Sequence, residues 1–272
     1  MVPGSIYTKG EMSTGEQLSI DYLTAIGEKR YTDYSLWTKF AFNTGINTGA
    51  LKILSNNLAI VQPSSGRRMS IVSTSVNDDV AGTGLRKVLL QYWDSSWVLQ
   101  SEVLEMDGTT EVNTDATDIF RIEALYRIDC GSGLCADGTI TMGDVPAGVP
   151  IYAQIDPDRA QFTRCLHYVA PGNIGIVPSI VASARTSGGV TFIIIVDQDF
   201  SPIGGLSRVP VGVGELEHSS GGTSYVRMDP PLAIDNREGI TGMAVGVVCA
   251  AVSAAGQDGS AAFTVYEYAP RY

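Results

Sequence analysis

Cysteines, histidines and paired carboxylates are the residues here whose types and spacing could support chemistry. The four cysteines include one close pair, Cys130 and Cys135, in the segment DCGSGLC. This spacing allows a disulfide across a turn, or half of a zinc site that Cys165 and His167 would complete. Alternatively, these thiols are small apolar side chains in a loop or core. We expect reduced thiols by default, since the N-terminus shows no signal peptide and folding in a cytoplasm keeps thiols reduced.

The histidines and aspartates show no arrangement that predicts catalysis. His167 and His218 lack a neighbouring Ser, Asp or Cys motif, and the sequence contains no Gly-x-Ser-x-Gly. The glycine-rich segment Gly82–Lys87 leads into a strand rather than into the helix that would bind phosphate. We therefore expect no enzyme activity, cofactor or metal. Three aspartate pairs are more typical of turns than of glycosidase or calcium sites: Asp78-Asp79, Asp156/Asp158 and Asp197/Asp199.

An aromatic cluster is the remaining candidate site. Tyr92, Trp93 and Trp97 gather around an expected hairpin tip. Aromatic faces stack on sugar rings, so the cluster is a candidate glycan platform. The alternative is that its members point into a core or a subunit interface.

Composition excludes two classes of partner. The formal net charge is −11, and an acidic chain repels phosphate backbones, so we expect no nucleic-acid partner. No apolar stretch reaches the ~18–20 residues that cross a bilayer, so we expect no membrane partner. Charged residues make up only 17% of the chain and glycines number 30, which favours short strands and tight turns over long surface helices.

The elements that would position these residues are mostly short strands. Apolar and polar residues alternate along Phe120–Asp129, which predicts a strand with one face on a core. Arg86–Trp93 and Trp97–Met106, joined by a short Asp-Ser-Ser turn, predict a hairpin. Further strands are expected at Met69–Ser75, Gly138–Met142, Ile151–Ile155, Cys165–Val169, Ile174–Ala184, Gly189–Val196, Tyr225–Met228, Gly242–Val252 and Ala262–Tyr268.

A proline- and glycine-rich segment at 143–150 interrupts this series and predicts a domain boundary. We therefore expect an all-β fold with two antiparallel, jelly-roll-like β-sandwich domains, at 56–146 and 147–272. An N-terminal arm at 1–55 would precede them.

The arm contains the chain's one helical pattern. The segment STGE at 13–16 has the form of a capping box, and Gly27 fits a helix end. A helix over 14–26 is only marginally stable alone, so its apolar face needs a docking surface. We expect this face to contact a partner subunit, and packing on the chain's own sheet is the alternative. The face consists of Leu18, Tyr22, Leu23 and Ile26.

Several of these segments resemble a family of virion proteins of tailed phages, including marine ones. The matching segments are IVSTSVNDDVAGTGLRKVLLQYWD, EVLEMDGTTEV, FRIEALYRIDCGSGLCADGTITM and IYAQIDPDRAQFTRCLHYVAPGNIG, and the resemblance covers roughly residues 70–272. It implies a β-sandwich virion component without catalytic residues. Cys130 and Cys135 stand where this family has small residues, which leaves room for a disulfide.

The resemblance and the composition together predict a non-enzymatic structural protein of a tailed-phage virion. It would be made in the host cytoplasm and then occupy the capsid surface, as a decoration or fibre-like protein, or the tail. We expect it to act as a homo-oligomer, a trimer or a ring, and to contact other virion proteins. The alternative function is a receptor- or glycan-binding module on the virion surface.

Overall fold

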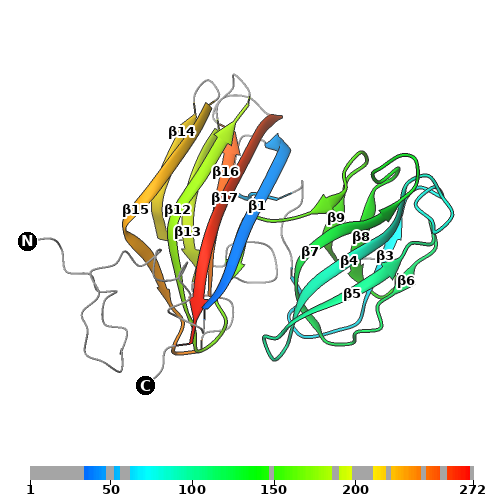
Figure 1. Cartoon of the computed structure of the whole chain (residues 1–272), viewed down its shortest axis with the longest axis horizontal. Coiled ribbons are helices and arrows are strands. Elements are labelled where there is room, and N and C mark those ends of the chain that lie inside the picture. Colours follow the sequence, from blue (N-terminus) through cyan, green and yellow to red (C-terminus); the bar gives the residue numbers. More distant parts are fainter. Residues whose placement is uncertain are drawn as a thin grey trace, which may run out of the picture.

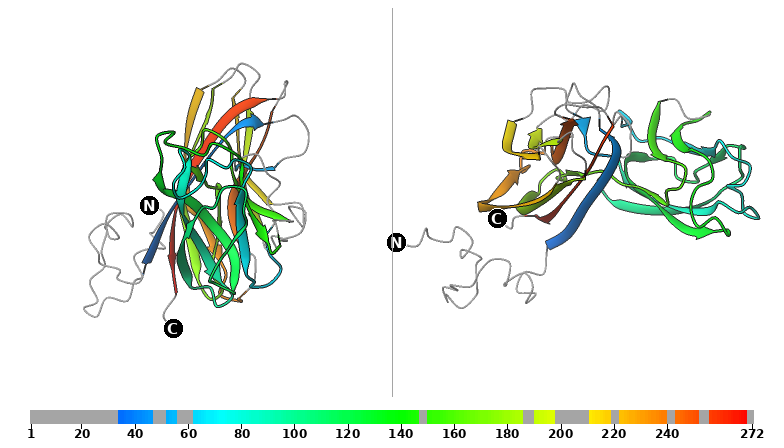
Figure 2. Two further views of the ribbon diagram at one scale, coloured as in Figure 1. Left: turned by 90° about the vertical axis from the view of Figure 1, so that its right-hand side faces the viewer. Right: turned by 90° about the horizontal axis from the view of Figure 1, so that it is seen from above.

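The computed structural model describes residues 34–46, 52–55, 62–146, 150–185, 190–197, 211–218, 222–239, 243–251 and 256–269. All the secondary-structure elements within these ranges are strands, and the paired strands are antiparallel. The all-β prediction is therefore confirmed for the described residues. The strands form two units that lie side by side, each around its own hydrophobic cluster (Figures 1 and 2). The expected helix at 14–26, with Leu18, Tyr22, Leu23 and Ile26, lies outside the described residues.

We call the smaller group of strands the small unit. Its two sheets have the orders β10-β7-β4-β5 and β6-β3-β8-β9. Both sheets contribute to one buried cluster, with Ile71 and Met142 from one sheet and Leu90, Ile122 and Phe162 from the other. Its strands are β3 (Met69–Ser73), β4 (Leu85–Asp94), β5 (Leu99–Glu105), β6 (Val112–Asn113), β7 (Ile119–Cys130), β8 (Ile140–Asp144), β9 (Ile151–Ile155) and β10 (Gln161–Phe162).

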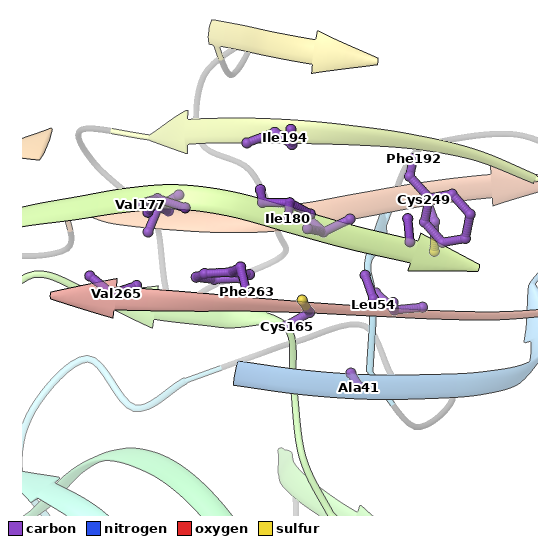
Figure 3. Close-up of a cluster of buried hydrophobic side chains, with 14 of the residues drawn as sticks. Ala41, Leu54, Cys165, Val177, Ile180, Phe192, Ile194, Cys249, Phe263 and Val265 are labelled. Atoms are coloured by element: carbon purple, nitrogen blue, oxygen red, sulfur yellow. The ribbon is translucent and has the colours of Figure 1, made fainter. Parts of the chain in front are cut away.

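The large unit also has two sheets around one cluster. One sheet has the order β1-β17-β12-β15, and the other has the order β11-β16-β13-β14, with β2 paired to β16. Figure 3 shows Val177 and Phe263 of the first sheet in the same cluster as Phe192 and Ile194 of the second. Its strands are β1 (Tyr34–Ile46), β2 (Lys52–Ile53), β11 (Leu166–Tyr168), β12 (Ile174–Ala184), β13 (Val190–Asp197), β14 (Val211–His218), β15 (Gly222–Asp235), β16 (Ala244–Ala251) and β17 (Gln257–Tyr268).

The division of strands between the units differs from the expected ranges. β8 and β9 pair with each other on either side of the 143–150 segment, so this segment connects two strands of one sheet. Within the expected arm, β1 pairs with β17 from Tyr34 to Ile46, and its Ala41 and Ile46 side chains belong to the large unit's core. Strand pairing decides both assignments: a hairpin between consecutive strands in the first case, and pairing with the distant β17 in the second.

β7 confirms the strand expected at Phe120–Asp129 but not its single apolar face. The register against β4 shifts around Glu123, which is the extra residue of a β-bulge. Because the extra residue reverses the alternation, Ile122 and Leu125 both enter the core, while Ile128 is 50% exposed. The bulge also turns Glu123 toward the large unit. The expected hairpin is confirmed by the pairing of β4 with β5.

Candidate functional site

The charged and aromatic side chains that could support a function gather where the two units meet, and we call this group the junction. Several are buried even though they are ionisable: Lys39, Arg121, Arg164, His167 and Glu267 are each at most 3% exposed. They come from both units, so the junction forms only when the units are in contact. Its members are Trp37, Lys39, Trp93, Trp97, Phe120, Arg121, Glu123, Arg164, His167, Tyr168 and Glu267.

An ion pair between Lys39 of β1 and Glu123 of β7 joins the two units. The other carboxylate oxygen of Glu123, Oε2, accepts a hydrogen bond from Trp93 Nε1 at 3.3 Å. Burial lowers the pKa of Lys39 well below its usual value, and the positive charge of Arg164 lowers it further. The pairing with Glu123 therefore offsets a high desolvation cost, and losing either partner would leave a buried charge alone.

Two arginines and a glutamine cover an open edge of β7. β10 pairs with β7 only at Gln161 and Phe162, so β7 continues past its neighbour. There the Ile122 amide donates to Gln62 Oε1 at 2.9 Å, and the Ile122 carbonyl accepts a hydrogen bond from Arg164. Arg121 donates to the carbonyls of Phe120 at 2.9 Å and Pro63 at 2.6 Å. Buried backbone groups require such partners, and these side chains supply them where no strand does.

Aromatic rings from the two units contact one another in tilted arrangements at the junction. Trp37 of β1 lies 5.1 Å from Trp93, and Trp97 lies 6.1 Å from Tyr168 of β11. These are centroid separations at which aromatic pairs attract beyond simple burial. Arg121 and Arg164 each lie 5.4 Å from the Tyr168 ring centroid, which adds cation–π attraction.

His167 and Glu267 form the buried polar pair on the large unit's side. His167 Nε2 lies 2.8 Å from Glu267 Oε2, and Oε1 accepts bonds from Ala170 N and Asn173 Nδ2, both at 2.8 Å. Burial lowers the pKa of His167 to about 4, although the bond to Glu267 opposes this. Burial alone would raise the pKa of Glu267, but these hydrogen bonds outweigh it and leave that pKa below its usual value. A neutral imidazole therefore donates to a carboxylate at neutral pH.

The contacts of the junction hold its side chains and the neighbouring backbone groups in place. Cys165 carries the thiol nearest to His167 in the sequence, and it is fully buried. Burial raises the pKa of this thiol, so the nucleophilic thiolate does not form. Among the described residues, His, Cys, Asp and Glu do not gather in threes as metal ligands would. In the same part of the chain no helix is long and apolar enough to cross a membrane.

Two residues of the candidate glycan platform, Tyr92 and Trp93, are buried, and the third, Trp97, is half-buried. Tyr92 is 7% exposed and belongs to the small unit's core, while Trp93 is 5% exposed and its ring packs at a tilt against Trp37. Trp97 packs against the buried residues of β11 and β16. The platform's members thus lie in a core and at an interface between units. Cys130 and Cys135 are free, half-buried thiols at the other end of β7.

One of the aspartate pairs has a structural role that its sequence did not reveal. Asp78 is fully buried, and its carboxylate accepts bonds from Ser73 Oγ (2.6 Å) and the amides of Leu85 (2.8 Å), Asp137 and Gly138 (both 2.9 Å). A Cβ on Gly84 would lie 2.1 Å from this carboxylate. The Gly-Thr-Gly segment before β4 therefore packs around Asp78 rather than around a phosphate.

No sequence pattern indicates that Lys39, Arg121, Glu123, Arg164 and Glu267 form a group. One signal was present for Lys39, which lies in phase with Trp37 and Ala41 along β1 and so on the strand's buried side. The other four residues come together only because the two units pack against each other. The alternation of apolar and polar residues along a strand does not predict such packing.

No family model matches this chain, and no curated protein matches it. Structural matches include the infectious bursal disease virus Gx strain (10% identity, 88% of this chain and 74% of that chain, TM-score 0.26). Another is the infectious bursal disease virus VP2 subviral particle (10% identity, 86% of this chain and 72% of that chain, TM-score 0.21). A third is the STIV MCP (8% identity, 87% and 97%, TM-score 0.22). These are weak similarities to viral proteins, and TM-scores this low establish no common fold.

Proposed function

We propose that this chain is a non-enzymatic structural component of a tailed-phage virion, at the capsid surface or on the tail. The resemblance to tailed-phage virion proteins over roughly residues 70–272 supports this assignment. The chain would be made in the host cytoplasm and act in the virion through contacts between subunits.

The observation that carries the proposal is the use of the chemically capable residues for internal contacts. Asp78 organises loops, His167 Nε2 bonds to Glu267, and Lys39 joins the units through Glu123. A protein that must hold neighbours in place needs a fixed shape. The buried Lys39–Glu123 pair and the tilted ring contacts favour one relative orientation of the two units, because each has directional geometry.

Exposed apolar residues offer surfaces for neighbouring subunits. Val76, Val80 and Leu134 are exposed in loops of the small unit, and Val98 and Val103 are exposed on its β4–β5 hairpin. Such residues favour association when they are gathered in a self-complementary patch. We propose a homo-oligomer, a trimer or a ring, that also contacts other virion proteins. The alternative of a receptor- or glycan-binding module is not favoured by any specific observation, because Tyr92 and Trp93 are buried.

The test is to locate the chain in particles. Antibodies against the purified chain are applied to phage particles from cultures that make it, followed by gold labelling and electron microscopy. We expect labels at repeated positions on the capsid or tail, and the purified chain to sediment as an oligomer. Absence of the chain from purified particles would contradict the proposal. So would polysaccharide hydrolysis that is lost on substitution of one described aspartate or histidine.

A further inference from the structure

The outer face of the β1-β17-β12-β15 sheet, on the side away from the core, carries an apolar row that crosses all four strands. Direct pairing aligns Phe40 of β1 with Ala262 of β17, Ala262 with Val181 of β12, and Val181 with Tyr225 of β15. Paired residues point to the same face of a sheet. The two ends of the row are well exposed, Phe40 at 45% and Tyr225 at 64%.

A second apolar pair lies nearer the start of β1. Leu36 is 61% exposed and pairs with Tyr266 of β17. The Leu36 pair and the Phe40 row are separated by four residues, or about 13 Å along a strand. The paired Thr38 and Thr264 lie between them, so this face of the sheet presents two apolar lines separated by one polar pair.

The N-terminal sequence contains a segment of matching length. Leu18 and Ile26 mark the ends of the apolar helical face at 14–26. They are eight residues apart, which is about 12 Å along a helix. The apolar face expected from this sequence pattern therefore has nearly the same length as the distance from the Leu36 pair to the Phe40 row.

The connection between the two also fits. Residues 27–33 lie between the helical segment and Tyr34, the first residue of β1. When extended, such a linker spans about 23 Å, enough for the chain to turn back over the sheet. The helix would then run antiparallel to β1, with Ile26 over the Leu36 pair and Leu18 over the Phe40 row. Consecutive elements usually lie next to each other, and helices cover sheet faces in this way.

We propose that residues 14–26 of this chain form a helix that docks on the outer face of its own β1-β17-β12-β15 sheet. The chain's own segment is the occupant because a short linker keeps it at a millimolar effective concentration, above that of a free second copy. This inference does not depend on the proposed function.

The first experiment measures amide hydrogen exchange across residues 14–26 of the full chain. Docking protects these amides, and Tyr22→Asp, at the centre of the apolar face, should reduce their protection by about tenfold or more. Gln17→Asp introduces the same residue on the opposite side of the helix and should leave protection largely unchanged. An unprotected segment in the unsubstituted chain, or equal losses in both variants, would overturn the proposal.

The second experiment alters the sheet instead of the segment. Tyr225→Ser and Phe40→Ser should each lower the protection of residues 14–26, with unchanged far-ultraviolet circular dichroism. Val103→Ser is the matched control, since Val103 is 51% exposed on β5 of the small unit. Protection that persists in both sheet variants would show that the segment docks elsewhere.

The third experiment distinguishes the chain's own segment from that of a second copy. Exchange and sedimentation are followed over about a hundredfold dilution, since only contact between copies depends on concentration. We expect protection of residues 14–26 to remain constant. Protection that disappears as an oligomer dissociates would overturn the proposal and assign the face to a second copy's segment.

Discussion

Two buried networks in this protein provide partners for buried ionisable side chains in different ways. Asp78 lies within the small unit and is surrounded by neutral donors, a hydroxyl and three backbone amides. At the junction, charged side chains contact other charged side chains and aromatic rings, and the pair of Lys39 and Glu123 is an example. The first network fixes loops that are already part of one core, and the second fixes the contact between two cores.

This difference predicts which part of the molecule should lose stability when each network is disrupted. Removing Asp78 leaves backbone groups without partners inside one unit, so the strands of that unit should lose stability directly. Disturbing the junction should separate the units while their sheets remain. The chain's three tryptophans, Trp37, Trp93 and Trp97, all lie at the junction, so tryptophan fluorescence reports on the junction and circular dichroism reports on the sheets.

The largest effect is expected for Asp78→Ala. It removes the acceptor of four hydrogen bonds to a charged group, and we expect a loss of about 4–5 kcal/mol in the free energy of unfolding. Urea denaturation followed by circular dichroism measures it. Asp79→Ala is the matched control, since Asp79 accepts one side-chain bond, from the Ala81 amide at 2.9 Å, and should cost below about 1 kcal/mol. Equal losses in both variants would remove the special role of Asp78.

The next effect tests the junction. Lys39→Met leaves Glu123 buried without its cation and should cost about 3–5 kcal/mol, with a red shift of tryptophan emission that precedes loss of the sheets on addition of urea. Adding Glu123→Leu should restore most of this stability, because two apolar residues need no counter-charge. A double variant as unstable as the sum of the single variants would show that the two residues do not act as a pair.

The junction should also be sensitive to acid, through the buried imidazole of His167. The pKa of His167 falls from 6.5 to about 4 on folding, so the unfolded chain binds the proton more readily. The contribution of neutral His167 to the free energy of unfolding is complete above pH 6.5. It is lost as the pH falls from there through about 4, and the loss amounts to about 3 kcal/mol. Urea midpoints at several pH values measure this slope. His167→Gln can still donate to Glu267 but does not titrate, and an unchanged slope would exclude His167 as the source.

The smallest effect is expected outside both networks. Cys130 and Cys135 are free and half-buried, so Cys130→Ser and Cys135→Ser should each change stability by less than about 0.5 kcal/mol. Alkylation without reductant, followed by mass spectrometry, measures their redox state. A cross-linked peptide from intact particles would contradict the expected free thiols.

Strands whose own residues specify them could be predicted from the sequence. β9 at Ile151–Ile155 and β12 at Ile174–Ala184 have the expected bounds, because β-branched runs with clear turn signals are enough. β1 was missed because its polar and aromatic residues look like a linker until β17 pairs with them. β14 at Val211–His218 was not among the expected strands, and it pairs with β13.

The junction could not be predicted for a related reason. Lys39 and Glu123 are 84 positions apart, and one is brought in by a strand and the other by a bulge. A bulge reverses which side chains face the core, and nothing in the alternation of Phe120–Asp129 indicates where the extra residue falls. Local patterns thus specify strands, while the charged contacts depend on the register between distant strands.

The pairing of β1 with β17 has a consequence for synthesis on the ribosome. The small unit, from Met69 to Phe162, is inserted between the second and third strands of the large unit, so it can fold while β12–β17 are still being translated. The large unit cannot close until β17 emerges, because β17 lies between β1 and β12. β1 must therefore wait, unpaired, while most of the chain is made. A nascent chain arrested after Phe162 should already hold a protease-resistant small unit, with β1 still open to cleavage.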